Sequence, residues 1–141
     1  MPDIVAPMER EVERPVLCID FDGVLHAYTS GWQGESVVAD GPVPGAMDFL
    51  AAAVDWFNVV IYSSRSRSED GIQAMNAAID QWLHDALPEA EADHVFSMIE
   101  FAHEKPAAFL TIDDRAICFD GTFPSISGMI SFKPWNKKGL E

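Results

Sequence analysis

Three short apolar runs, each ending in or followed by polar side chains, constrain the fold of this chain most strongly. They cover residues 16–21, 58–63 and 109–112. Runs of this length and apolar character are typical of strands that are buried on both faces of a parallel sheet. The ligands of such sheets bind beyond the carboxyl ends of the strands. The runs therefore predict a parallel sheet that brings polar groups to one edge.

Helical periodicity separates the apolar runs. A first amphipathic helix is predicted between the first two runs by the helical spacing of Met47, Leu50, Ala51 and Val54. A second helix is predicted over about residues 68–87, with Ser66 and Glu69 at capping-box spacing. The acidic stretch 88–93 is expected to be a solvated connection or a frayed helix end, and 97–101 a short strand. We therefore expect an α/β fold, a Rossmann-like three-layer sandwich with a mainly parallel central sheet.

Composition indicates one globular domain. The chain has 141 residues, of which 48% are hydrophobic and 23% are charged, and this length suffices for a single core. Its formal net charge of −14 repels polyanions at long range, which argues against a nucleic-acid-coating role. A divalent cation held by carboxylates would neutralise this charge locally, so an anionic small substrate stays compatible with the composition.

Neither the first residues of the chain nor its cysteines indicate export. The polar residues 1–14 lack the apolar stretch of a signal peptide, and no segment approaches the roughly 18 apolar residues of a membrane span. Cys18 and Cys118 lie in separate apolar runs without metal-ligand spacing, which indicates buried thiols in a reducing compartment. We therefore expect a cytoplasmic protein with no membrane partner.

The first apolar run ends in two carboxylates, Asp20 and Asp22, and Gly23 lets the backbone turn sharply behind them. This pair alone is compatible with a simple turn, because Asp and Gly are common in loops. Polar residues at the other strand ends favour a functional site instead, namely Ser63, Ser64, Asp113 and Asp114. The predicted sheet would place all of them along one edge.

The order of these motifs resembles the haloacid dehalogenase (HAD) superfamily of phosphohydrolases over about residues 16–121. The four family motifs are matched in turn by Asp20-Phe21-Asp22-Gly23, by Ser63 after a hydrophobic strand, by Lys105, and by Asp113-Asp114. The resemblance implies a Mg²⁺-dependent phosphatase that hydrolyses a phosphate monoester through an aspartyl-phosphate intermediate. It also implies a Rossmann-like fold.

Within this resemblance, the carboxylates divide into nucleophile, acid and metal ligands. Asp20 is expected to be the nucleophile, while Asp22 protonates the leaving oxygen and later deprotonates the attacking water. Mg²⁺ is expected on Asp20, the main-chain carbonyl of Asp22, Asp113 and Asp114, the last directly or through water. The alternative for Asp113 and Asp114 is a turn after the strand, with Arg115 as their salt-bridge partner.

The remaining matches concern the phosphate and the substrate. Ser63, or its neighbour Ser64, is expected to donate its hydroxyl to a phosphoryl oxygen. Lys105 is expected to neutralise charge on the phosphate and Asp20, with an ordinary surface lysine as the alternative. A loop histidine such as His26 is more often exposed to solvent than bound to a substrate. The candidate substrate contacts are Gly23, His26, Ser64 and Arg65.

No separate cap domain is expected, because residues 24–45 are too few for a second core and indicate a short flap. An open site of this family admits a nucleotide, a metabolite or a macromolecular phosphate ester. The basic segment 132–141 is expected to be a solvated tail, with guidance of an anion as the alternative. Two other functions stay open: a phospho-accepting signalling module, which the motif order disfavours, and a catalytically idle fold that binds a ligand or partner.

Overall fold

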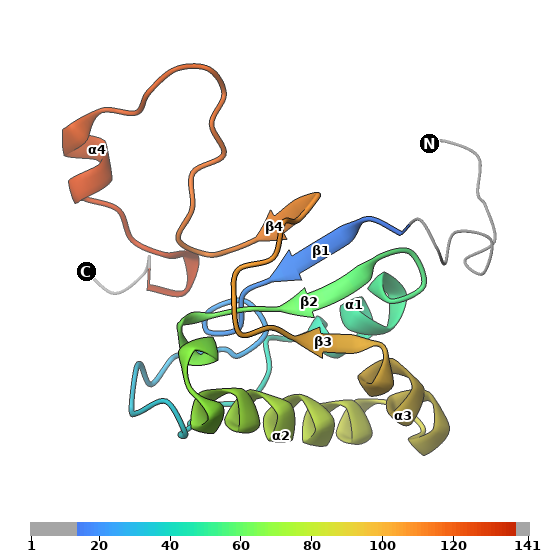
Figure 1. Cartoon of the computed structure of the whole chain (residues 1–141). Helices are drawn as coiled ribbons and strands as arrows, with labels where there is room; N and C mark the ends of the chain where they lie inside the picture. Colours follow the sequence, from blue (N-terminus) through green and yellow to red (C-terminus); the bar gives the residue numbers. More distant parts are fainter. Residues whose placement is uncertain (1–13, 138–141) are drawn as a thin grey trace.

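A four-stranded, all-parallel sheet forms the centre of the protein. A computed structural model describes residues 14–137 (Figure 1). The strands lie in the order β3-β2-β1-β4, where β1 is Val16–Ile19, β2 is Asn58–Ile61, β3 is Ile99–Phe101 and β4 is Leu110–Ile112. The helices are α1 (Ala46–Ala53), η2 (Ser64–Arg67), α2 (Glu69–Ala86), α3 (Glu89–Ser97), α4 (Ile126–Ile130) and η3 (Trp135–Lys137). The predicted α/β fold with a parallel sheet is confirmed.

One apolar core lies between the sheet and three of the helices. Every second strand residue enters it, including Leu17, Ile19, Val59 and Ile61, because successive side chains of a strand point to opposite faces. The helices α1, α2 and α3 supply the other side of the core. Helix α4 contributes no buried residue. The second helical layer of a three-layer sandwich therefore stays a prediction.

Two details of the helices differ from the sequence-based expectation. The cap of α2 is Ser68, whose side chain accepts the amide hydrogen of Gly71 (3.0 Å), whereas Ser66 forms a reciprocal capping box with Ser63 in η2. The expected connection 88–93 is wrong, because these residues begin the regular helix α3. Ala92 and Val95 of α3 are buried in the core, and this packing fixes a stretch whose acidic residues suggest only solvent exposure.

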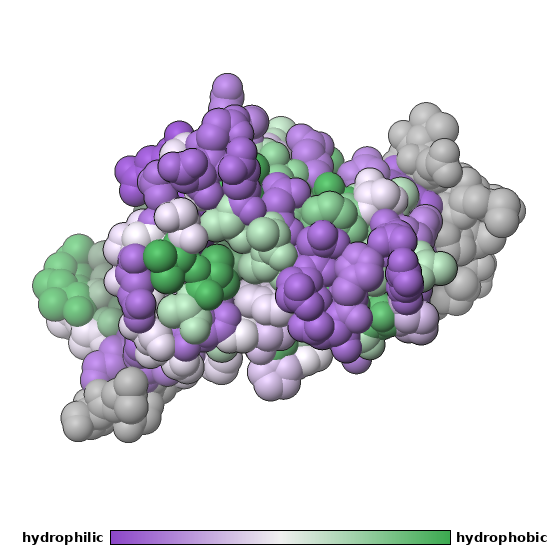
Figure 2. All heavy atoms as spheres, turned by 90° about the horizontal axis from the view of Figure 1, so that it is seen from below, coloured by the Kyte–Doolittle hydropathy of each residue, from purple (hydrophilic) through white to green (hydrophobic). Residues whose placement is uncertain are grey.

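The chain leaves the core after β4. Residues 115–132, which we call the C-terminal lobe, project from the sheet and carry α4 (Figure 1), and all of them are exposed. Figure 2 shows hydrophobic residues gathered at this end of the molecule. Cys18 is buried as expected, but Cys118 is exposed in the lobe, because its apolar run forms no strand.

Parts of the chain fall outside this description. The N-terminal segment, apart from Arg14, and residues 138–141 of the predicted tail lie outside the described residues. None of the helices within residues 14–137 combines the length and the apolar character needed to cross a bilayer.

Substitution of Gly71 tests how tightly α2 packs on the preceding turn. A Cβ at this position would overlap the carbonyl oxygen of Arg65 and lie 2.8 Å from its carbonyl carbon. We expect Gly71→Ala to lower the free energy of unfolding by about 1–3 kcal/mol, as overpacking does, although alanine is the better helix former. Urea unfolding monitored by circular dichroism measures the change.

The matched control is Gly41→Ala, because a Cβ at Gly41 would meet nothing within 4 Å. This control is expected to stay within about 0.5 kcal/mol of the wild type. Equal stability of the two variants would contradict the proposed close packing.

Candidate active site

The carboxyl ends of β1 and β4 bring three of the predicted carboxylates together. Ile19 pairs with Ile112 at the ends of these strands, and the amide of Asp20 donates to the carbonyl of Ile112 (3.0 Å). Beyond this bond, one ligand atom each from Asp20, Asp113 and Asp114 lies within 4.8 Å of the others. Two neighbouring strands thus build the acidic cluster, as their order in the sheet requires.

The acidic cluster carries more negative charge than its environment stabilises. Burial of the carboxyl and the charge of Asp113 raise the pKa of Asp20 to about 8, against the hydrogen bond from the Phe21 amide. Burial likewise raises the pKa of Asp114. Carboxylate oxygens crowded in this way are the donors that a hard divalent cation such as Mg²⁺ prefers. The donor set therefore fits the metal that the sequence predicts.

Gly23 makes room for this cluster. Its φ of +84° is favourable only for glycine, and an added Cβ would overlap the carboxylate of Asp114. The backbone amide of Arg115 fixes the other acidic residue by donating to Oδ1 of Asp113 (2.8 Å). Gly23 is a candidate substrate contact from the sequence, and the structure adds a steric reason for a glycine there.

Asp22 lies outside the acidic cluster and is bound by two buried side chains. Its Oδ1 accepts a hydrogen bond from Nδ1 of His26 (2.8 Å), and its Oδ2 accepts one from Nε of Arg65 (2.9 Å). The amide of Asp40 donates to Nε2 of His26 (3.1 Å), which assigns the ring proton to Nδ1. His26 is fully buried, so the expectation of a solvent-exposed loop histidine is wrong.

These contacts stabilise the ionised form of Asp22. Burial of the carboxyl would raise its pKa, but the hydrogen bonds from His26 and Arg65 and the charge of Arg65 act in the opposite direction. The net effect is a pKa below the ordinary value for aspartate. Asp22 therefore differs from Asp20, although only one residue separates them.

Arg65 connects the first motif to the segment 24–45. Its guanidinium donates to the carbonyls of Glu35 (2.7 Å) and Gly34 (3.3 Å), and it lies over the ring of Trp32 at 5.0 Å. Arg65 is only 1% exposed. Nη2, the remaining nitrogen of the guanidinium, is buried and has no hydrogen-bond partner among residues 14–137. As a candidate substrate contact, Arg65 therefore lies beneath the surface, where it holds Asp22 and the flap in place.

The two serines after β2 have different environments. Ser63 is 6% exposed, and its hydroxyl accepts the amide hydrogen of Arg65 (3.0 Å) and donates to the sulfur of Met75 (3.4 Å). Ser64 is exposed. The structure therefore uses the hydroxyl of Ser63 as a helix cap and leaves that of Ser64 accessible to solvent.

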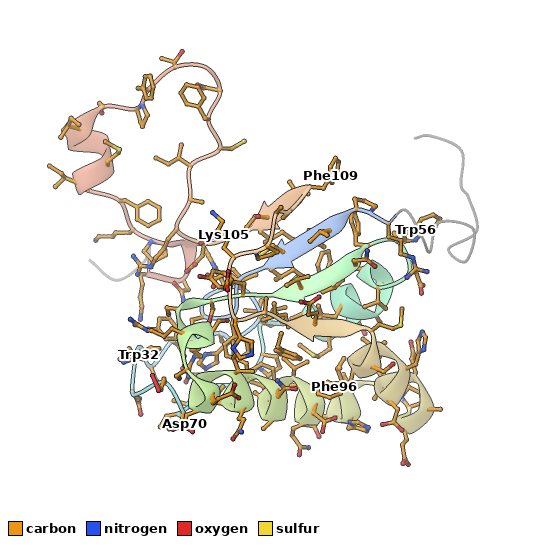
Figure 3. All side chains as sticks on the ribbon, in the orientation of Figure 1. Trp32, Trp56, Asp70, Phe96, Lys105 and Phe109 are labelled. Carbon is orange, nitrogen blue, oxygen red and sulfur yellow. The ribbon has the colours of Figure 1, made fainter. Side chains whose placement is uncertain are left out.

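Lys105 is exposed and lies near the carboxyl ends of β1 and β4 (Figure 3). Its influence is seen at Cys18, where burial and the charge of Asp20 raise the thiol pKa and the charge of Lys105 acts in the opposite direction. Among residues 14–137, Lys105 makes no salt bridge. Its ammonium is thus available beside the acidic cluster.

The end of the described chain binds the loop behind the first motif, which the sequence did not indicate. The indole nitrogen of Trp135 donates to the carbonyl of Gly23 (2.7 Å), and the side-chain amide of Asn136 donates to the carbonyl of Ala27 (2.9 Å). Lys137 donates to the carbonyl of Thr29 (3.2 Å). The expected solvated tail is wrong for these residues, because their side chains form hydrogen bonds with carbonyls of the loop.

Comparisons of the chain with protein-family models, with curated proteins and with solved structures gave no match.

The acidic cluster predicts a pH dependence of stability in the absence of divalent cations. With its pKa raised to about 8, folded Asp20 keeps a proton that the unfolded chain has already released above its ordinary pKa. Rising pH therefore removes stability, and we expect the melting temperature to fall between about pH 5 and about pH 8. Millimolar Mg²⁺ should reverse this fall, because it replaces the proton at the carboxylates.

Differential scanning calorimetry with EDTA or with Mg²⁺ tests this expectation. Asp20→Asn should flatten the decline, whereas Asp48→Asn, an exposed position on α1, should leave it unchanged. A melting temperature that is insensitive to pH and to Mg²⁺ would contradict the assignment of a metal-binding cluster.

Removal of Arg65 tests the anchoring of Asp22. Arg65→Met leaves the carboxylate without its cationic partner, and loss of one member of a buried pair typically costs about 3–5 kcal/mol. We expect chemical denaturation to show a loss of this size. The double variant Arg65→Met/Asp22→Asn should recover part of it, because the uncompensated charge is gone. A double variant no more stable than the single one would exclude this explanation.

Proposed function

We propose that this chain is a Mg²⁺-dependent phosphomonoesterase of the HAD type, with Asp20 as its nucleophile. The observation that carries the proposal is the convergence of Asp20, Asp113 and Asp114 beyond the ends of neighbouring parallel strands. The order of the motifs along the chain, and the nearby Lys105, support the same assignment. The proposed fold is the Rossmann-like fold of that superfamily.

The acidic cluster would hold the Mg²⁺ ion through Asp20, Asp113 and Asp114, together with the main-chain carbonyl of Asp22 that the family resemblance adds. When bound, Mg²⁺ supplies the positive charge that lets an anionic phosphate approach an anionic nucleophile. Lys105 adds a second positive charge near the carboxyl ends of β1 and β4, where it is exposed (Figure 3). Ser64 offers an accessible hydroxyl for a phosphoryl oxygen, with Ser63 beneath it as a cap.

The proposed reaction has two displacements at phosphorus. In the first, a carboxylate oxygen of Asp20 attacks phosphorus, the bond from phosphorus to the ester oxygen breaks, and that oxygen takes a proton to leave as an alcohol. In the second, water attacks phosphorus and loses a proton, the aspartyl bond to phosphorus breaks, and inorganic phosphate leaves. The carboxylate of Asp20 is thereby regenerated.

Asp22 is our candidate for both proton transfers, as the family resemblance implies. The hydrogen bonds that it accepts from His26 and Arg65 favour its ionised form in the resting state and fix its carboxylate in the loop after the proposed nucleophile. To donate a proton, it must first give up one of these bonds, since a protonated carboxyl has only one full acceptor oxygen left for them. His26 and Arg65 are thus positioning residues that set when Asp22 is protonated.

Substitution of Asp20 tests the proposed function. Purified protein should hydrolyse 4-nitrophenyl phosphate with Mg²⁺ and lose this activity with EDTA. Asp20→Asn should reduce kcat by about 1,000-fold or more, because the nucleophile is removed. Asp55→Asn is the matched control, since Asp55 is exposed in the turn after α1 and precedes β2, whose other end leads to Ser63.

Trapping the intermediate separates the covalent route from direct attack by water. Acid-quenched protein incubated with a ³²P-labelled phosphate ester should carry label that hydroxylamine removes, and Asp20→Asn should carry none. Full activity of Asp20→Asn, or Mg²⁺-independent turnover, would overturn the proposed function.

A further inference from the structure

The C-terminal lobe begins and ends at the candidate active site. It leaves the sheet at Arg115, the residue directly after the acidic pair. It returns to η3, whose Trp135 is hydrogen-bonded to the carbonyl of Gly23, and Gly23 is in turn the residue that makes room for Asp114. Both ends of the lobe are therefore fixed next to the acidic cluster, while its middle projects away from the sheet (Figure 1).

The lobe forms an open cavity of about 480 Å³, and every residue that lines it is exposed. The segment before α4, α4 itself and the segment after it all contribute to the lining. The lining includes Arg115, Ile117, Pro124, Gly128, Met129 and Phe132. This volume and this apolar lining are typical of sites that bind small organic molecules. The cavity thus has the size that a small organic ligand needs. Arg115, which lines it, directly follows Asp113 and Asp114 in the sequence.

The charge and polarity of the cavity restrict what it can hold. Arg115 is the charged residue of its lining, and the guanidinium also acts electrostatically on Asp114 and Tyr28. The hydroxyl of Ser125 is already engaged by the amide of Gly128 (3.0 Å). The hydroxyl groups of a sugar that face this apolar lining would lack hydrogen-bond partners, which costs binding energy. An apolar ring has no hydroxyl groups, so its binding to this lining would not carry that cost.

We propose that the cavity of the C-terminal lobe binds the organic group of the phosphate ester, and that this group is an apolar or aromatic ring system. The proposal rests on the function proposed above and adds the substrate class to it. With phosphate at the acidic cluster, the ring enters between Ile117 and Met129, and Arg115 faces the anionic end of the ester. The lobe then supplies the recognition that the short segment 24–45 has too few residues to provide.

Narrowing the cavity tests the proposal. Met129→Trp should lower kcat/KM for 1-naphthyl phosphate by about tenfold or more, and for glycerol 3-phosphate by less than about twofold, because only the ring uses the cavity. Ile130→Trp is the matched control: this neighbour on α4 is 81% exposed and does not line the cavity. It should leave both values unchanged. Ile117→Trp narrows the opposite wall and should reproduce the effect if Met129→Trp folds poorly.

Binding of the dephosphorylated product separates this proposal from the proposed function. Isothermal titration calorimetry should detect binding of 1-naphthol to the wild type and to Asp20→Asn, and weaker binding to both cavity variants. Binding with this pattern in a protein without phosphatase activity would support the cavity and overturn the proposed function. Mg²⁺-dependent turnover with an unchanged substrate preference in both cavity variants would overturn the cavity assignment alone, as would absence of naphthol binding.

Discussion

The buried hydrogen bond between Arg65 and Asp22 is the interaction on which the arrangement of the site depends. It joins the loop after β1 to the turn after β2, and the same guanidinium binds two carbonyls of the segment 24–45. Asp22 alone would be a costly buried charge, and so would Arg65. Their pairing lets both leave solvent, with His26 satisfying the second oxygen. Three separate segments therefore take their positions from one ion pair.

This pairing also separates the chemistry of two neighbouring carboxylates. Asp20 faces other acidic groups and has a raised pKa, whereas Asp22 faces donors and has a lowered one. The turn after β1 is responsible. Residues two positions apart in a strand would project to the same side, but β1 ends at Ile19, and the chain turns before it reaches Asp22. One side of the loop thus suits a cation that compensates charge, and the other holds an anion ready for proton transfer. The proposed division between nucleophile and acid follows from this difference.

The sequence predicted most of the sheet and the acidic cluster, because each strand is a compact apolar run followed at once by its polar residue. Asp20, Asp113 and Asp114 therefore came together as expected. Contacts between residues that are far apart in the sequence could not be predicted. No local pattern shows that His26 is buried against Asp22, or that Trp135 binds a carbonyl more than one hundred positions away. Helix α3 was missed because its two buried residues, Ala92 and Val95, are outnumbered by acidic ones.

The exposure of the C-terminal lobe has a consequence for how such a protein can change. None of its residues enters the core. One end of the lobe follows β4, and the other leads to Trp135, whose indole is hydrogen-bonded to the carbonyl of Gly23. Alterations between these ends leave the packing of the sheet untouched, and the lobe can vary in length at little entropic cost. Stability and molecular recognition are thereby assigned to different stretches of one short chain, so that selection can act on one without disturbing the other.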